Sequence, residues 1–202
     1  MKILPTINSA LAVITSLTLF STQQSLMAQV EGNLFPEGAF EMEAIQGMPD
    51  GWGIPDKNDR PWKGGSVVSI ETEESGHYAR LTTVAEFPYL YALSAVIPVP
   101  EGKKTLNVSA RMRMKMETVP GDWNGFKFNI GFAEVAGTGP GTKDYNVTND
   151  STVFSLQENS EEWKTLTGNV VVPEGAKFIC MRLFVGSMLG TFDIDDITIT
   201  TD

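Results

Sequence analysis

Residues 105–116 alternate strictly between apolar and polar side chains, and this alternation constrains the fold more than any other feature of the chain. Leu106, Val108, Ala110 and three methionines share one parity, whereas Asn, Ser, Arg and Lys occupy the positions between them. A period of two is typical of a β-strand with one face in the core and the other in water. The sequence therefore predicts a sheet that is buried on one side only.

Seven further segments have the composition of short strands, separated by glycine, proline and aspartate. Their predicted bounds are 67–71, 79–83, 93–99, 126–134, 163–172, 177–185 and 191–200. No segment has a convincing helical period. This number of short strands favours an all-β fold, an antiparallel β-sandwich of two sheets. Residues 135–151, rich in Gly, Thr, Asn and Asp, are predicted to be a loop.

A Pro-Glu-Gly turn occurs twice, at residues 100–102 and 173–175. Proline fixes a negative φ, and glycine permits the positive φ of a tight reversal. Each turn is predicted to tie the two strands that flank it into an antiparallel pair.

The last predicted strand changes parity along its length. Phe192 and Ile194 keep a period of two, but Ile197 and Ile199 fall on the opposite parity. The core-facing set must therefore switch at residues 195–196, as a β-bulge allows. A bulge frees backbone carbonyls, and carbonyl and carboxylate oxygens are the ligands that a hard cation prefers.

Residues 1–28 are predicted to be an export signal and residues 29–202 a single domain. Lys2 supplies a positive charge, residues 10–20 are mostly apolar, and small residues ending at Ala28 follow. A membrane span needs about 20 consecutive apolar residues, and Thr15, Ser16 and Thr18 interrupt this run. We therefore predict a secreted or periplasmic protein without a membrane span.

Residues 29–202 are strongly acidic. They contain 14 Lys and Arg against 25 Asp and Glu, a formal net charge of −11. This charge argues against nucleic acid or an anionic membrane as the partner. Cys180 is the only cysteine, so an intramolecular disulfide is excluded; its apolar surroundings predict a buried strand residue rather than a reactive thiol.

Seven segments follow one another along the domain: residues 33–41, 51–52, 93–102, 163–168, 172–177, 184–186 and 192–200. Taken in this order, they resemble the carbohydrate-binding modules of families 4, 9 and 22, which are often appended to glycoside hydrolases. The resemblance implies a jelly-roll β-sandwich that binds a polysaccharide or oligosaccharide without cleaving it. It leaves open an association with a separate glycoside hydrolase.

The resemblance also implies a structural Ca²⁺ where the first and last strands meet. Glu41 and Asp196 would be its side-chain ligands, with a backbone oxygen from near Gly38. The alternative is that the two carboxylates only solvate a sheet edge.

Aromatic side chains decide where a sugar binds, because they stack on its flat C–H faces while polar groups hold its hydroxyls. Trp62 and Trp123 lie in polar, loop-like sequence, and Tyr89 and Tyr91 would share a strand face. Trp52 and Trp163 are interpreted as structural. The predicted carbohydrate-binding residues are Trp62, Tyr89, Tyr91, Arg111, Arg113, Trp123, Lys127 and Asn129.

The basic members of this set, with Arg182, lie on the wet faces of their strands. If these strands are neighbours in one sheet, they form a cationic floor that suits an acidic or sulfated glycan. The alternative is that alternating Arg and Lys only keep a sheet face soluble.

Two other function classes remain open. A triad enzyme needs a histidine base, and His77, the only histidine, lies in a predicted turn. A glycosidase needs only two carboxylates, which the sequence does not exclude. A jelly roll can also act as a structural or adhesive protein–protein module at the cell surface, which would have an exposed apolar patch.

Overall fold

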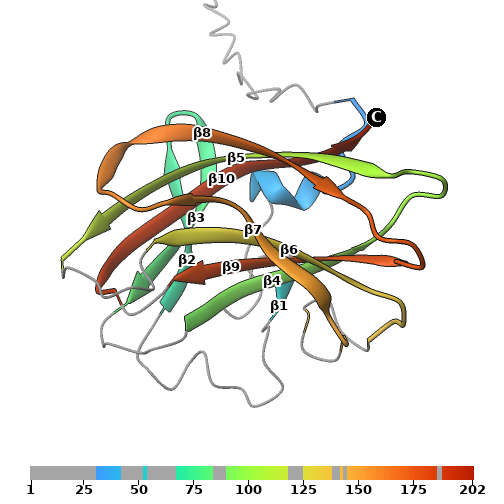
Figure 1. Cartoon of the computed structure of the whole chain (residues 1–202). Coiled ribbons are helices and arrows are strands. Elements are labelled where there is room, and N and C mark those ends of the chain that lie inside the picture. The colour runs from blue at the N-terminus through green and yellow to red at the C-terminus, as the bar shows by residue number, and fades with distance from the viewer. Residues whose placement is uncertain are drawn as a thin grey trace, which may run out of the picture.

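The computed structural model describes residues 31–41, 52–53, 67–83, 90–117, 125–137, 142, 145–185 and 188–202. In these residues two five-stranded antiparallel sheets face each other (Figure 1). The elements are the 3₁₀ helix η1 (Pro36–Ala39) and the strands β1 (Trp52–Gly53), β2 (Val67–Glu73), β3 (Gly76–Thr83), β4 (Leu90–Pro98), β5 (Thr105–Met116), β6 (Phe126–Ala133), β7 (Thr148–Leu156), β8 (Ser160–Val171), β9 (Phe178–Val185) and β10 (Gly190–Thr201). The predicted all-β sandwich is confirmed.

We call the sheet with strand order β1-β4-β9-β6-β7 sheet I and the sheet with order β2-β3-β10-β5-β8 sheet II. No helix among the described residues is long and apolar enough to span a membrane. The predicted export signal at residues 1–28 lies outside the described residues.

The core lies between the inner faces of the two sheets. Leu106, Val108, Ala110, Met112 and Met114 of β5 are at most 2% exposed, which confirms the period-two prediction. β6 of sheet I supplies the opposing apolar residues Phe126, Phe128, Ile130 and Phe132, which are equally buried. Each large side chain contributes about 1.5–3 kcal/mol through removal of its surface from water.

The loop prediction for residues 135–151 is wrong at its end, because residues 148–151 belong to β7. β7 pairs with β6 at the edge of sheet I, with two register shifts. Its first five side chains are all polar and all exposed. The sequence therefore shows no alternation of apolar and polar residues there, which is the signal that predicts a strand.

The Pro-Glu-Gly turns have the predicted local geometry but the wrong predicted role. Gly102 and Gly175 have positive φ values of 73° and 82°. However, the first turn leads from β4 in sheet I to β5 in sheet II, and the second leads from β8 in sheet II to β9 in sheet I. Both turns therefore connect the two sheets and form no hairpin.

The predicted bulge in the last strand is confirmed. The register between β10 and β5 shifts between Asp195 and Thr198, and Asp196 adopts a positive φ of 48°. As a result Phe192 and Ile194 before the bulge and Ile197 and Ile199 after it are all at most 1% exposed.

The opening segment lies against β10 as predicted, but not as a strand. The backbone N–H of Leu34 donates to the carbonyl of Ile199 (2.8 Å), and the N–H of Ile199 donates to Asn33 Oδ1 (2.9 Å). The chain then turns into η1, where a Cβ on Gly38 would lie 2.5 Å from the carbonyl oxygen of Ile197. Only glycine fits this close approach.

Candidate functional site

The predicted cationic residues divide between two separate faces. Arg111 and Arg113 lie on β5 in sheet II, whereas Lys127 and Asn129 lie on β6 in sheet I, beside Arg182 on β9. Buried side chains alternate with these residues along β5 and β6, so these residues lie on the outer face of their own sheet. The prediction of one cationic floor is therefore wrong, because its strands are not neighbours in one sheet.

The outer face of sheet I brings together three of the predicted binding positions. Phe184 of β9 pairs with Tyr91 of β4 on one side and with Lys127 of β6 on the other. The next outward row contains Arg182 and Asn129. Tyr91, Lys127 and Asn129 thus occupy neighbouring register positions, with Tyr91 described by its backbone alone.

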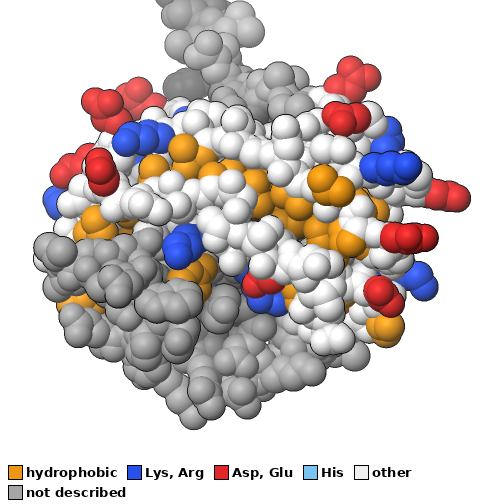
Figure 2. Space-filling model, in the orientation of Figure 1, with side chains coloured by type: hydrophobic (Ala, Val, Ile, Leu, Met, Phe, Trp, Pro, Cys, Tyr) orange, Lys and Arg blue, Asp and Glu red, His pale blue; other side chains and the backbone are white. Residues whose placement is uncertain are grey.

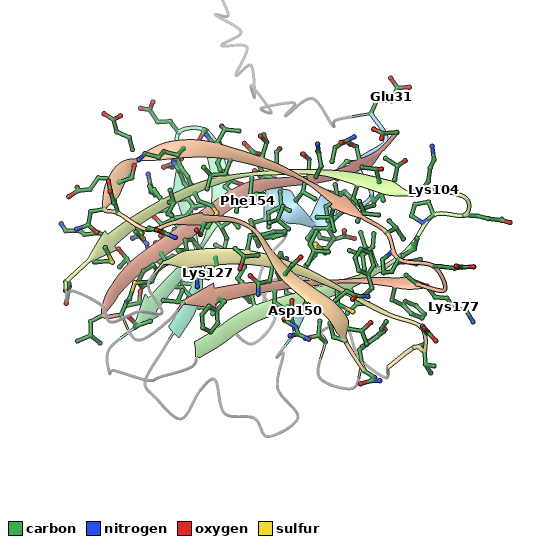
Figure 3. The ribbon with its side chains drawn as sticks, in the orientation of Figure 1. Glu31, Lys104, Lys127, Asp150, Phe154 and Lys177 are labelled. Carbon is green, nitrogen blue, oxygen red and sulfur yellow. The ribbon has the colours of Figure 1, made fainter. Side chains whose placement is uncertain are left out.

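Polar contacts hold the described side chains of this face in place. Arg182 donates to Asp150 Oδ2 (2.8 Å), and Thr152 donates to Asn129 Oδ1 (3.0 Å). Lys127 Nζ lies 5.8 Å from the centre of the Phe184 ring. Figure 3 shows Lys127 on β6 and Asp150 on β7. The face therefore offers cations, an amide, a hydroxyl and a carboxylate within the three adjacent strands β9, β6 and β7.

Residues that follow β6 cover part of this face. The N–H of Thr142 donates to Ser94 Oγ (3.0 Å), and Ser94, which is in the same register row as Arg182 and Asn129, is fully buried. At the start of β9 the ring of Tyr145 contacts that of Phe178 (5.5 Å). Lys127 and Asn129 are half-buried.

The other predicted stacking residues, Trp62, Tyr89 and Trp123, lie outside the described residues. Strand residues close in sequence to two of them lie at one end of sheet I, where Leu90 and Phe126 both pair with Val185. Tyr89 precedes Leu90 in sequence, and Trp123 lies three positions before Phe126. Trp52 was interpreted as structural, and it is buried against Phe35 and Phe40.

The outer face of sheet II carries a network of ion pairs that the sequence did not reveal. Asp193 of β10 is 3% exposed although it points away from the core. Arg80 of β3 donates to it through Nε and Nη2 (2.7 and 2.8 Å), and Arg113 donates through Nε (2.7 Å). The hydrogen bond and charge of Asp193 raise the pKa of Arg80 above its usual range.

Aromatic rings complete the network. Arg113 lies 4.2 Å from the centre of the Trp163 ring and 4.8 Å from that of Tyr78. Glu73 accepts from Trp163 Nε1 (2.7 Å) and from Arg113 (3.1 Å). Burial alone would raise the pKa of Glu73, but the hydrogen bonds from Ser75, Trp163 and Arg113 lower it overall.

Arg111 pairs with both aspartates at the bulge. It donates to Asp195, which is 2% exposed, and lies 2.8 Å from Asp196 Oδ2. Burial raises the pKa of Asp195 to about 6, although the Arg111 hydrogen bond opposes this shift. Arg111 and Arg113, both predicted to bind sugar, are thus engaged by carboxylates of their own chain.

The two predicted calcium ligands have other partners. Glu41 pairs with the His77 ring (3.0 Å) and accepts from its backbone N–H (3.2 Å), while Asp196 pairs with Arg111. Among the described residues, no three Asp, Glu, His or Cys side chains gather as a metal site would require. The present arrangement does not fit Ca²⁺ unless Asp196 releases Arg111, so calcium binding stays a prediction.

Sequence reasoning missed Arg80, Asp193, Asp195, Glu73 and Tyr78. The available signal was that Asp193 and Asp195 alternate with core residues in a strand, which places carboxylates on a sheet face instead of a loop. Asp193 pairs with Arg80, 113 residues away in sequence, and Asp195 pairs with Arg111, 84 residues away. No local pattern indicates these partners.

Among the described residues, the His77 ring pairs with Glu41 and hydrogen-bonds no hydroxyl or thiol. Cys180 is fully buried, and burial raises the pKa of its thiol to about 11.

No protein-family model and no curated protein matches the sequence. Solved structures do match. The enzymatically active domain of tailspike protein 4 of bacteriophage CBA120 has a TM-score of 0.62 at 12% identity; the match covers 84% of this chain and 21% of the tailspike chain. The first family 22 xylan-binding module of Xyn10C from Paenibacillus barcinonensis has a TM-score of 0.50 at 14% identity, covering 84% of this chain and 95% of the module. The tandem of family 22 modules from that protein has a TM-score of 0.52 at 14% identity, covering 84% of this chain and 46% of the tandem.

At these identities the likeness is one of fold. The resemblance seen in the sequence is confirmed at that level: the chain has the jelly-roll β-sandwich fold of carbohydrate-binding modules.

Proposed function

We propose that the protein is an exported, non-catalytic carbohydrate-binding protein that binds a polysaccharide or oligosaccharide on the outer face of sheet I. The observation that carries this proposal is the register that brings Tyr91, Lys127 and Asn129 together on that face. Aromatic rings would stack on the sugar, and the cations, amide and hydroxyls of β6, β7 and β9 would hold its hydroxyl groups.

Two observations support this proposal. The family 22 module with this fold is described as xylan-binding, which supports sugar binding. Tyr89 and Trp123 are close in sequence to Leu90 and Phe126, which lie at one end of sheet I, and this supports the choice of face. Calcium and an association with a separate glycoside hydrolase remain parts of the proposal without support from the fold.

The absence of catalysis is also proposed. It is supported by two observations: among the described residues no hydroxyl or thiol hydrogen-bonds the His77 ring, and burial raises the pKa of the Cys180 thiol to about 11. If two carboxylates acted as a glycosidase, the protein would hydrolyse a bound polysaccharide and release reducing ends. An assay for reducing ends therefore tests whether the protein is non-catalytic.

The test of binding is a glycan array followed by affinity electrophoresis with the polysaccharide that the array identifies. Trp62→Ala, Trp123→Ala and Asn129→Ala should each reduce retardation. Thr167→Ala, an exposed residue on the outer face of sheet II, is the matched control and should not. Retardation that survives all three substitutions would place the sugar elsewhere, and an array without any bound glycan would reject the function.

A second candidate function is a structural or adhesive protein–protein module. Figure 2 shows an apolar band across the face where Figure 1 places β7 and β8. Val153 and Phe154 of β7 and Leu166 and Val170 of β8 are only partly buried against the core. Such a band suits a protein contact. Light scattering that finds a stable dimer, lost in Val153→Lys, would favour this function.

A further inference from the structure

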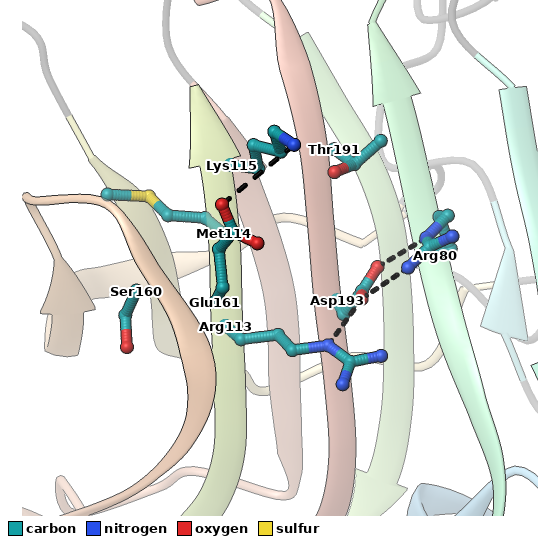
Figure 4. A pocket seen from close by; sticks show the side chains of 8 residues that line it. All are labelled: Arg80, Arg113, Met114, Lys115, Ser160, Glu161, Thr191 and Asp193. Atoms are coloured by element: carbon teal, nitrogen blue, oxygen red, sulfur yellow. Dashed lines mark hydrogen bonds and ion pairs between the residues drawn. The ribbon is translucent and has the colours of Figure 1, made fainter. Parts of the chain in front are cut away.

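A pocket on the outer face of sheet II has a chemistry different from that of the proposed sugar face. Its volume is about 220 Å³. Figure 4 shows cationic side chains of β3 and β5 around a carboxylate of β10, with the start of β8 along one side. Its lining includes Arg80, Arg113, Lys115, Glu161, Thr191 and Asp193.

The pocket exists because β8 bulges away from β5. Met112 pairs with Lys164, but Met114 pairs with Ser160, so three residues of β8 oppose one residue of β5. At this bulge the start of β8 leaves regular pairing with β5, and the Trp163 ring packs against Arg113. The space that opens is lined by outward side chains of three other strands.

Asp193 holds two guanidinium groups in fixed orientations at the pocket. It accepts from Nε and Nη2 of Arg80 and from Nε of Arg113, while Glu73 accepts from Nη1 of Arg113. Within the described part of the chain, Arg80 Nη1 and Arg113 Nη2 donate no hydrogen bond. Because the two side chains are already ordered, a ligand that uses these donors would lose little conformational entropy on binding.

The mouth of the pocket already holds a carboxylate, but loosely. Glu161 lies 3.8 Å from Lys115 Nζ, which is too long for a hydrogen bond, and the two side chains are 76% and 65% exposed. An exposed pair of this kind contributes little to stability. Another oxyanion can therefore replace Glu161 beside Lys115 at small cost.

We propose that this pocket binds an oxyanion, either a free inorganic ion or the sulfate or carboxylate group of an acidic glycan, between Arg80, Arg113 and Lys115. The paired oxygens of such a group match the spare N–H donors of guanidinium groups, and the Thr191 hydroxyl lies at the same pocket. The site lies on the sheet opposite the proposed sugar face, so it would serve as a second, separate point of attachment.

The experiment titrates sodium sulfate and sodium phosphate into the ¹⁵N-labelled protein at constant ionic strength, set with chloride. The Nε–Hε signals of Arg80 and Arg113 and the amide of Thr191 should move in a saturable way. Lys115→Gln should weaken binding about three- to tenfold, since it removes one exposed charge at contact distance. Glu161→Gln should tighten binding by a similar factor, because it removes the competing carboxylate.

Lys104→Gln is the matched control, since it removes the same charge from an exposed turn outside the pocket. Shifts that do not saturate, or a loss in Lys104→Gln equal to that in Lys115→Gln, would overturn the proposal. Both test residues are exposed, so neither substitution threatens the fold.

A sulfated and a neutral polysaccharide, each tested with and without excess sodium sulfate, distinguish the two sources of the anion. If the glycan is the source, sulfate displaces the sulfated polysaccharide and Lys115→Gln weakens its binding. If the free ion is the source, sulfate still moves the arginine signals but the polysaccharide does not. Asn129→Ala changes only the sheet I face. If this substitution leaves glycan binding unchanged, the proposed sugar face is wrong, but the anion titration of this pocket is unaffected.

Discussion

The buried carboxylate of Asp193 should be the most sensitive point of the sheet II surface, and its charge can be removed without a change of shape. Asp193→Asn leaves Arg80 and Arg113 facing each other with no anion between them. Breaking a buried ion pair costs about 3–5 kcal/mol. The two arginine side chains are 31% and 19% exposed, so water can screen part of their repulsion. We therefore expect the free energy of unfolding to fall by about 2–4 kcal/mol.

In a domain of this length the loss corresponds to a decrease in Tm of about 5–12 °C. Urea unfolding and calorimetry at pH 7 measure it. Asp150→Asn is the control, because it removes one carboxylate from a single pair with Arg182 in which the aspartate is 27% exposed; there we expect a loss of about 0–1 kcal/mol. The reasoning is refuted if the two substitutions cost the same. It is supported if Arg80→Gln restores stability to Asp193→Asn, since that change removes one of the repelling charges.

Three shorter predictions concern a proton, a thiol and a metal. The pKa of Asp195 is raised to about 6 in the folded state, compared with about 3.9 in the unfolded chain. The folded state therefore binds this proton more tightly, and the free energy of unfolding should fall as pH rises from about 4 to 6. Asp195→Asn should flatten that part of a stability profile measured by urea unfolding. Cys180, with a raised pKa of about 11 and full burial, should not react with a disulfide reagent at pH 8 until the protein unfolds, and rapid native labelling would contradict its placement. If Glu41 and Asp196 bind Ca²⁺, Tm should rise with calcium and fall with chelator, and Asp196→Ala should abolish the difference.

Period-two patterns predicted most of the strands because they are local. The alternation of β5 gave its bounds and its core face, and the parity change between Ile194 and Ile197 predicted the bulge in β10. Both inferences follow from side chains that alternate along one backbone, so no knowledge of the neighbouring strands is needed.

The partners of each strand could not be predicted in the same way. A Pro-Glu-Gly turn reverses the chain, but it does not determine whether the next strand joins the same sheet or the facing one. That choice placed Arg113 and Lys127 on opposite faces and invalidated the cationic floor. β7 was not predicted at all, because the exposed polar residues at its start resemble a loop.

The candidate site was predicted only in part for the same reason. Lys127 and Asn129 were identified correctly as outward residues. The burial of Asp193 depends on arginines from two other strands, and a single sequence carries no record of that pairing.

The order of strands has a consequence for how this chain folds. β9 is the central strand of sheet I and β10 is the central strand of sheet II, although they are the last two strands in sequence. Until residues 178–201 have been synthesised, each sheet consists of two halves without the strand that joins them. Such non-local pairing slows folding. For a protein that we propose is exported, this delay would keep the polypeptide unfolded during synthesis, in the extended state that a translocation channel accepts.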